Sequence, residues 1–140
     1  MVIHKIIIDT NLWISLLIGK RLSELRNLCN NDSIVVYICD ELISEFVKVS
    51  SSDKIRKRVS EERIVKTLEL ITMSCVNATI IQKADAPDLR DKKDLFLLSL
   101  AETIVADYIL TGDKDLLSLQ NHNRTKIVAY QEFISLVSVH

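Results

Sequence analysis

An apolar run that ends abruptly in polar residues constrains the fold more than any other part of this sequence. Residues 5–11 read Lys-Ile-Ile-Ile-Asp-Thr-Asn. The three consecutive isoleucines indicate a strand buried on both faces, which is typical of the interior of a parallel sheet. Asp9 then follows the carboxyl end of that strand, where open α/β sheets bind their ligands. A carboxylate there is costly unless it is hydrogen-bonded, paired or bound to a metal.

A second strand repeats this arrangement near the end of the chain. Residues 108–115 read Tyr-Ile-Leu-Thr-Gly-Asp-Lys-Asp, so an apolar strand again runs into an acidic turn that contains Asp113. Two strand ends that carry aspartates predict a shared acidic pocket. Acidic pockets of this kind bind divalent cations.

Strand and helix signals alternate along the chain. Strands are expected over residues 3–8, 33–38, 76–81, near Tyr108 and over 127–129, and helices over 11–18, 22–30, 41–47, 64–71, 95–105 and 133–137, with a helical turn at 116–117 and a polar loop over 85–93. Alternating βα units with hydrophobic strands predict a central, mainly parallel sheet of about five strands, covered by helices on both faces.

Composition limits the class of protein. At 140 residues, 48% of them hydrophobic, the sequence predicts a single domain over residues 1–140 with a substantial core. No apolar run is long enough to span a membrane, and the first residues do not resemble a signal peptide. The three cysteines form no C-x-x-C pair, which favours a reducing cytoplasm. A net charge of −1 does not by itself indicate nucleic acid binding.

Four acidic residues map to one edge of the predicted sheet. In right-handed βαβ units the carboxyl ends of strands and the amino ends of helices share an edge. Asp9 and Asp113 follow strands, whereas Glu45 and Asp94 lie near the starts of predicted helices. Clustered carboxylates repel one another, and a hard cation relieves that repulsion. Oxygen-only ligands favour Mg²⁺ or Mn²⁺ over zinc.

Each of these acids also has a simpler interpretation when taken alone. Asp9 and Asp94 could be N-caps, Glu45 a solvated helix residue, and Asp113 part of a turn. Their shared edge favours a metal site, because perturbed acids cluster at functional sites. For Asp91 and Asp115 the two interpretations remain balanced.

Four segments carry a resemblance to a known family: residues 9–11 with Ser15, residues 40–46 around Glu45, residues 91–97 around Asp94, and residues 106–117 around Asp113. Together they resemble the PIN-domain superfamily, and within it the toxin-like, VapC-type branch. This resemblance implies a three-layer αβα fold. Trp13 departs from the small aliphatic residue common in the family, and Leu95 replaces an acid often found beside Asp94.

The resemblance also implies an activity. PIN-like toxins are Mg²⁺- or Mn²⁺-dependent endoribonucleases, in which water activated by the metal attacks the RNA phosphodiester. The metal-binding and catalytic acids implied are Asp9, Glu45, Asp94 and Asp113, with Asp115 as a possible fifth ligand and Thr10, Asn11 and Thr111 as the residues that orient them. A cognate antitoxin is an expected partner.

Candidates for RNA contacts are basic residues near these acids. Lys92, Lys93 and Lys114 are the best placed. The basic cluster at residues 54–58 is interpreted as a solvated helix face or loop, because Glu61 and Glu62 follow it. His4, His122 and His140 are expected at surface positions.

The predicted helix over residues 11–18 bears on assembly. It is apolar nearly all round and contains Trp13, a residue type favoured at interfaces. Cover by other helices of the same chain explains the run equally well. Because related toxins commonly dimerise and bind an antitoxin segment in an apolar groove near the active site, we expect a homodimer with an exposed apolar groove.

Three other functions fit parts of the pattern. A receiver-type signalling domain would place an acidic pair after the first strand, but Thr10 and Asn11 follow Asp9 here. A haloacid-dehalogenase-type phosphatase would need a second Asp where the chain has Asn11. A non-catalytic PIN-like binding module of RNA or protein is disfavoured because all four acids are present.

Overall fold

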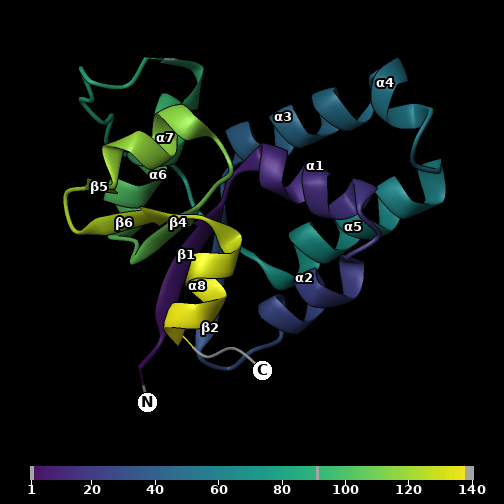
Figure 1. The fold of residues 1–140 in the computed structure, drawn as a ribbon, viewed down its shortest axis with the longest axis horizontal. Helices are drawn as coiled ribbons and strands as arrows, with labels where there is room; N and C mark the ends of the chain where they lie inside the picture. Colours follow the sequence, from purple (N-terminus) through teal and green to yellow (C-terminus); the bar gives the residue numbers. More distant parts are fainter. Residues whose placement is uncertain (1, 91, 138–140) are drawn as a thin grey trace.

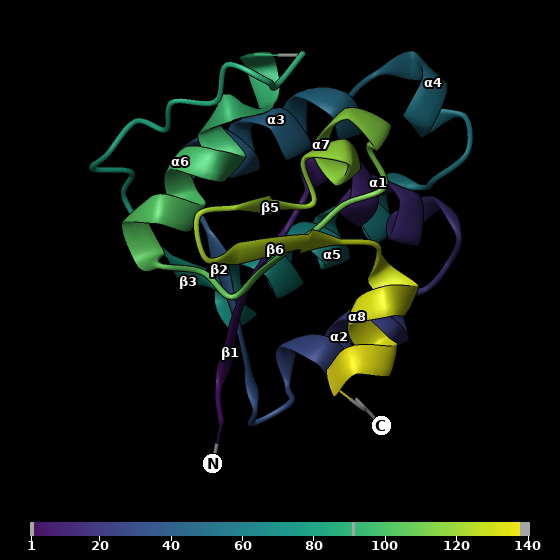
Figure 2. The same ribbon diagram turned by 60° about the vertical axis from the view of Figure 1, so that its left-hand side comes forward.

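The computed structural model describes residues 2–90 and 92–137, apart from the side chain of Lys93. Its six strands form one sheet in the order β3-β2-β1-β4-β6-β5. The strands are β1 (His4–Ile8), β2 (Ile34–Ile38), β3 (Val76–Asn77), β4 (Tyr108–Leu110), β5 (Asn121–His122) and β6 (Thr125–Val128). All neighbours are parallel except β5 and β6, which lie side by side in Figure 2. The predicted α/β class with a mainly parallel sheet is therefore confirmed, with one strand more than expected.

Strand β1 lies in the interior of the sheet for the reason its composition suggests. Ile6, Ile7 and Ile8 are completely buried. Ile7 pairs with Tyr37 of β2 on one side and with Ile109 of β4 on the other. A strand with neighbours on both sides and helices over both faces has no polar side, so only a continuous apolar run fits there.

Helices flank the sheet on both sides. They are α1 (Thr10–Ile18), α2 (Leu22–Cys29), α3 (Asp40–Ser50), α4 (Asp53–Arg56), α5 (Glu61–Ser74), α6 (Leu95–Ile104), α7 (Lys114–Leu119) and α8 (Tyr130–Val137), with a 3₁₀ turn at Lys92–Asp94. Figure 1 shows α1, α3, α4 and α5 grouped on the right, and α6 and α7 on the left. This arrangement is consistent with the predicted three-layer αβα fold. Within the described residues, no helix is both long and apolar enough to cross a membrane.

Several elements differ from the sequence prediction. The strand expected over residues 76–81 is only Val76–Asn77, because its side chains find little to pack against: Val76 and Ile81 are both exposed. Helix α4 overlaps the basic segment 54–58, for which the sequence left a helix face and a loop open. The helix expected to end at Val105 ends one residue earlier, since Val105 adopts a left-handed conformation with φ of 56°.

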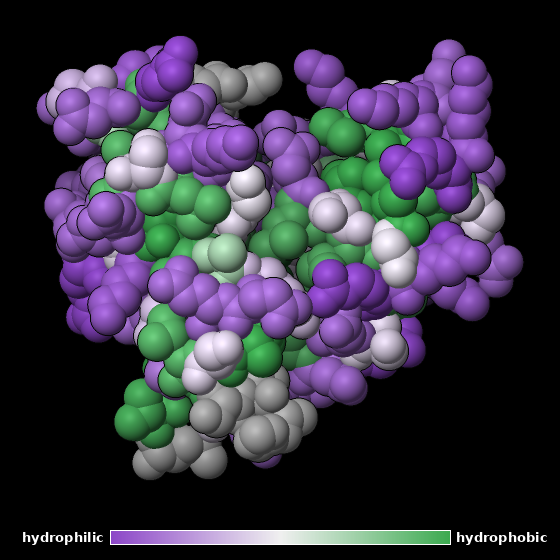
Figure 3. Space-filling view, viewed as in Figure 1, coloured by the Kyte–Doolittle hydropathy of each residue, from purple (hydrophilic) through white to green (hydrophobic). Residues whose placement is uncertain are grey.

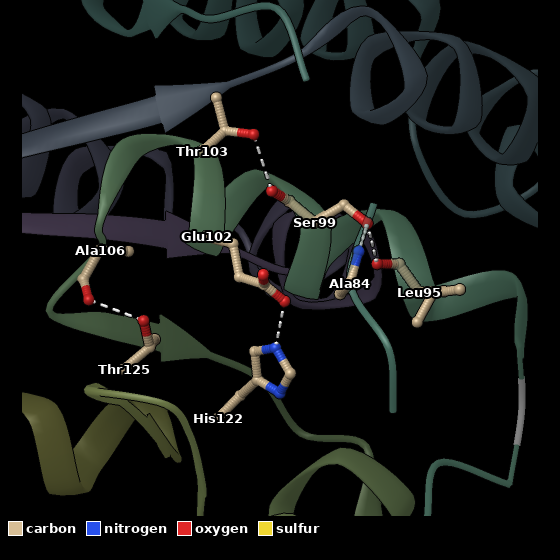
Figure 4. A network of polar contacts seen from close by, with 8 residues as sticks. All are labelled: Ala84, Leu95, Ser99, Glu102, Thr103, Ala106, His122 and Thr125. Carbon is tan, nitrogen blue, oxygen red and sulfur yellow. Dashed lines mark hydrogen bonds and ion pairs between the residues drawn. The ribbon is translucent and has the colours of Figure 1, made fainter. Parts of the chain in front are cut away.

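Hydrogen bonds to α6 fix the irregular segment that precedes Asp94. The Ala84 amide donates to the Ser99 hydroxyl at 2.9 Å, and the Ile81 amide donates to Thr103 Oγ1 at 3.2 Å. The Ser99 hydroxyl donates in turn to the Leu95 carbonyl at 3.1 Å, as Figure 4 shows. The segment therefore has a defined position despite its lack of regular structure.

His122 is not at the surface position predicted for it. It belongs to β5, and its Nε2 lies 2.6 Å from Glu102 Oε2 of α6, with about an eighth of each side chain exposed. Figure 4 shows this contact joining the β5–β6 hairpin to α6. His4, also expected at a surface position, is the first residue of β1 and is half-buried, and His140 lies outside the described residues. The sequence lacks a local signal for the His122 contact because its partners are 20 residues apart.

Trp13 resolves the alternatives for the apolar segment 11–18. The residue is completely buried, and Leu16 and Leu17 are nearly so. Helix α1 contacts α2, α3 and α5, which cover these side chains. The explanation by cover within the chain is thus confirmed for Trp13, and the suggestion that it reaches a subunit interface is wrong.

A truncation of one buried side chain in β1 tests the central role of this strand. Ile7→Ala should lower the free energy of unfolding by about 2–5 kcal/mol, because it leaves a cavity in a fully packed strand. Ile81→Ala is the matched control, since Ile81 is 82% exposed and should cost about 0.5 kcal/mol or less. Urea unfolding monitored by circular dichroism measures both. Equal losses in the two variants would contradict this account of the core.

Candidate active site at the carboxyl ends of β1 and β4

The backbone of Asp9 joins a strand to a helix. Its amide donates to the Leu110 carbonyl at 2.9 Å, which continues the pairing of β1 with β4. Its carbonyl accepts from the amides of Leu12 at 2.9 Å and Trp13 at 3.1 Å, which begins α1. Because both of its backbone groups are bonded in this way, Asp9 has a fixed position at the edge of the sheet.

The side chain of Asp9 is buried and held by two donors. The Thr111 hydroxyl donates to Oδ2 at 2.7 Å, and the Asn11 amide donates to Oδ1 at 3.4 Å. Asp9 is only 3% exposed. The N-cap interpretation is therefore confirmed, although the capping bond to Asn11 is long and the Thr111 bond is the closer one.

Thr111 also connects Asp9 to Asp113. Its hydroxyl accepts a hydrogen bond from the Asp113 amide at 3.0 Å while donating to Asp9. Asp113 Oδ1 then accepts from the amides of Asp115 at 2.7 Å and Leu116 at 3.3 Å, and so caps α7. The predicted turn role of Asp113 is correct, and the same turn brings its carboxylate near Asp9.

Burial makes the ionised form of Asp9 unfavourable. Desolvation is the largest cause that raises the pKa of this carboxyl, and the nearby charge of Asp113 raises it further. The hydrogen bonds from Thr111 and from the backbone of Asn11 and Thr10 lower the pKa, but not enough to restore its ordinary value. The two aspartates are therefore close enough to interact electrostatically.

An open hollow lies beside this pair. It has a volume of about 290 Å³ and is lined by Asn11, Leu12, Ser15, Gly112 and Asp113. Asn11 and Ser15 are four residues apart and so share one face of α1. A Cβ added at Gly112 would meet nothing within 4 Å, so the glycine borders open space. The sequence had suggested Gly112 only as part of a turn, and nothing in it indicated a pocket wall.

Glu45 and Asp94 come from neighbouring elements. Asp94 occupies the N-cap position of α6, as its simpler interpretation expected, and is 6% exposed, but its carboxylate makes no capping hydrogen bond to the described part of that helix. Glu45 lies half-buried in the middle of α3. Both residues take part in interactions. Within the described residues no three metal-ligating side chains form a cluster ready to bind a cation, so convergence of the four acids stays a prediction.

The remaining candidates vary in their surroundings. The Lys92 ammonium donates to the Ala86 carbonyl at 2.7 Å and so holds the preceding loop, which argues against a free role at the substrate. Lys114 is exposed at the start of α7, and Asp115 is half-buried in the same turn. The side chain of Lys93 and the whole of Asp91 lie outside the described residues.

Thr10 does not orient an acid through its hydroxyl. Its Oγ1 is buried and has no hydrogen-bond partner among the described atoms, and the same holds for Trp13 Nε1. The backbone of Thr10, not its side chain, lowers the pKa of Asp9. Of the three residues expected to orient acids, Thr111 orients Asp9 with its side-chain hydroxyl, and Asn11 does so with its backbone N–H.

Comparison with known proteins agrees with this arrangement. The sequence profile of the PIN domain matches residues 5–115, which include β1, β4 and all four acids. The chain belongs to the PIN-domain family. It is also similar to the uncharacterized protein MJ1680 of Methanocaldococcus jannaschii, with 33% identity over 123 residues that cover 86% of this chain and 77% of that protein. PIN domains are generally nucleases and typically use divalent metals.

Asp9→Asn should stabilise the fold at neutral pH. A raised pKa means that the folded state disfavours the ionised carboxylate, so stability is lost as the pH rises above the ordinary value of 3.8 toward the folded-state pKa. Asparagine keeps the shape and can still accept from Thr111, but it carries no charge. We expect a higher melting temperature than wild type at pH 7 and a difference that shrinks below pH 3.8.

The control for this comparison is Asp32→Asn, because Asp32 is exposed between α2 and β2. Its melting temperature should follow that of the wild type at both pH values. Thermal unfolding by circular dichroism measures all three proteins. A lower melting temperature for Asp9→Asn at pH 7 would show that the charge of Asp9 stabilises the fold.

Proposed function

We propose that this chain is a Mg²⁺- or Mn²⁺-dependent endoribonuclease that hydrolyses RNA phosphodiester bonds. The observation that carries the proposal is the buried Asp9 carboxylate beside Asp113, at the sheet edge where α/β proteins bind ligands. Among the described side chains, Asp9 is met by a hydroxyl and backbone amides and not by a basic group. Two adjacent acids without a basic partner favour a cation.

The residues present fit such a cation. Asp9 and Asp113 offer hard carboxylate oxygens, and neither histidine nor cysteine lines the adjacent hollow. Asp9 and Asp113 would hold the cation, with Glu45 and Asp94 supplying further oxygens and Asp115 a weaker candidate. When bound, a divalent cation supplies a lowered pKa for water and neutralises charge on the phosphate oxygens.

The chain's own residues position the reactants. Thr111 fixes the orientation of Asp9 by donating to Oδ2, and the amides of Asp115 and Leu116 fix Asp113. The hollow beside Asp113 gives the scissile phosphate a place next to these acids, and Gly112 leaves its wall open. Lys114, exposed at the start of α7, is the described lysine best placed to contact the RNA backbone.

The alternatives have less support. A receiver-type domain would need an acidic pair after the first strand, where this chain has Thr10 and Asn11. Membership of the PIN-domain family favours nuclease chemistry. A non-catalytic binding module has no need for a desolvated acid pair, which raises the pKa of Asp9 and costs stability. Cleavage of RNA separates the two functions directly.

We further propose that the protein acts in the cytoplasm as the toxin of a toxin–antitoxin pair and forms a homodimer. The support is the resemblance of residues 9–11, 40–46, 91–97 and 106–117 to the toxin-like branch of the family. Because Trp13 is buried within the chain, the dimer contact must use other residues. Light scattering at micromolar concentration should give twice the chain mass of 16.0 kDa, and a mass of one chain would contradict the dimer.

Cleavage of a fluorescent single-stranded RNA tests the nuclease. We expect cleavage with added Mn²⁺ or Mg²⁺ and none with a chelator. Asp9→Asn, Glu45→Gln, Asp94→Asn and Asp113→Asn should each reduce the rate to background, because each removes a charge from the cation's ligands. Glu132→Gln, an exposed acid on α8, is the matched control and should cleave as the wild type does. Chelator-resistant cleavage, or an active Asp9→Asn variant, would refute the proposal.

A further inference from the structure

A second hollow continues from the candidate active site. It has a volume of about 480 Å³ and lies between α1, the end of α3, and α4. Asn11 and Ser15 line both this hollow and the one beside Asp113. The two hollows therefore adjoin at Asn11 and Ser15, and we call the larger one the α1 trough.

The α1 trough has an apolar floor and a basic rim. Ile14, Ile18, Val49 and Ile55 supply the apolar lining, and the charged residues that line it are Lys54 and Arg58. None of the described lining residues is acidic. Figure 3 shows hydrophobic surface bordered by hydrophilic residues on the side of the molecule where Figure 1 places α1 and α4.

The charges of the rim are available to a ligand. Within the described residues neither Lys54 nor Arg58 forms an ion pair, whereas the neighbouring Arg56 lies 3.8 Å from Glu61. The sequence interpretation of residues 54–58 as a solvated surface relied on the acids that follow. The structure separates the cluster: Arg56 lies toward Glu61, and Lys54 and Arg58 line the trough.

We propose that the α1 trough binds single-stranded RNA on one side of the scissile bond, with Lys54 and Arg58 contacting its phosphates. This inference rests on the proposed nuclease function. Unpaired bases can pack on the partly exposed side chains of Ile18 and Val49, whereas a duplex hides its base faces. From Asn11 to Ile18 the helix rises about 10 Å, so the trough reaches beyond the nucleotides at Asp113. Its position next to the hollow at Asp113 favours substrate over any other polyanion.

Charge reversal measured without cleavage tests the trough. In an Asp9→Asn background, Lys54→Glu with Arg58→Glu should weaken binding of a fluorescein-labelled 12-nucleotide RNA at least tenfold by anisotropy. The slope of log affinity against log salt should fall by about 1.4, since each phosphate contact on a single strand contributes about 0.7. The matched control is Lys83→Glu with Lys126→Glu, two exposed lysines outside the trough, which should change neither quantity.

Two features make the result decisive. The double variant should unfold in urea at the same midpoint as its parent, because Lys54 and Arg58 are exposed. If the midpoint changes, the binding measurement is repeated on each single substitution. Binding is read without turnover, so an inactive nuclease would refute the proposed function and leave the trough to be judged by anisotropy. Unchanged RNA affinity and salt slope would overturn the inference and favour an acidic amphipathic protein segment as the occupant.

Discussion

The hydrogen bond from Thr111 to Asp9 is the interaction on which the rest of the site depends. It joins residues 102 positions apart, at the carboxyl ends of β1 and β4. It forms only because β1 pairs directly with β4, which in turn requires the fully apolar Ile6, Ile7 and Ile8 at the centre of the sheet. A packing requirement in the core thus sets the position of a carboxylate at the edge.

That position makes the charge of Asp9 costly. The fold buries the carboxylate and places Asp113 close by, so the ionised form of Asp9 is unfavourable in the free protein and the pKa of Asp9 is raised. Hydrogen bonds from Thr111 and the α1 backbone offset part of the cost. A divalent cation would offset the remaining cost. The free energy gained by relieving this cost would then add to the affinity for the cation. In the proposed function, the open hollow beside Asp113 would admit the scissile phosphate next to that cation.

The sequence predicted what depends on local pattern and missed what depends on distant contacts. The isoleucine run located β1 and Asp9, and the acidic turn after Tyr108 located Asp113, whereas its capping of α7 was found only in the structure. The contact of His122 with Glu102 joins separate elements and left no local signal. The α1 trough likewise exists only because α4 lies against the exposed side of α1. For Trp13 the sequence indicated burial but not what buries it, since an apolar helix has the same pattern whether its own chain or a partner covers it.

Anomalous scattering from a crystal grown with Mn²⁺ tests the central claim, that the acid pair is a cation site, most directly. The account predicts an anomalous peak at the carboxyl ends of β1 and β4, about 2.0–2.6 Å from oxygens of Asp9 and Asp113. Asp9→Asn crystals grown in the same way should lose that peak. Wild-type crystals at saturating Mn²⁺ with no peak between Asp9 and Asp113 would contradict the account.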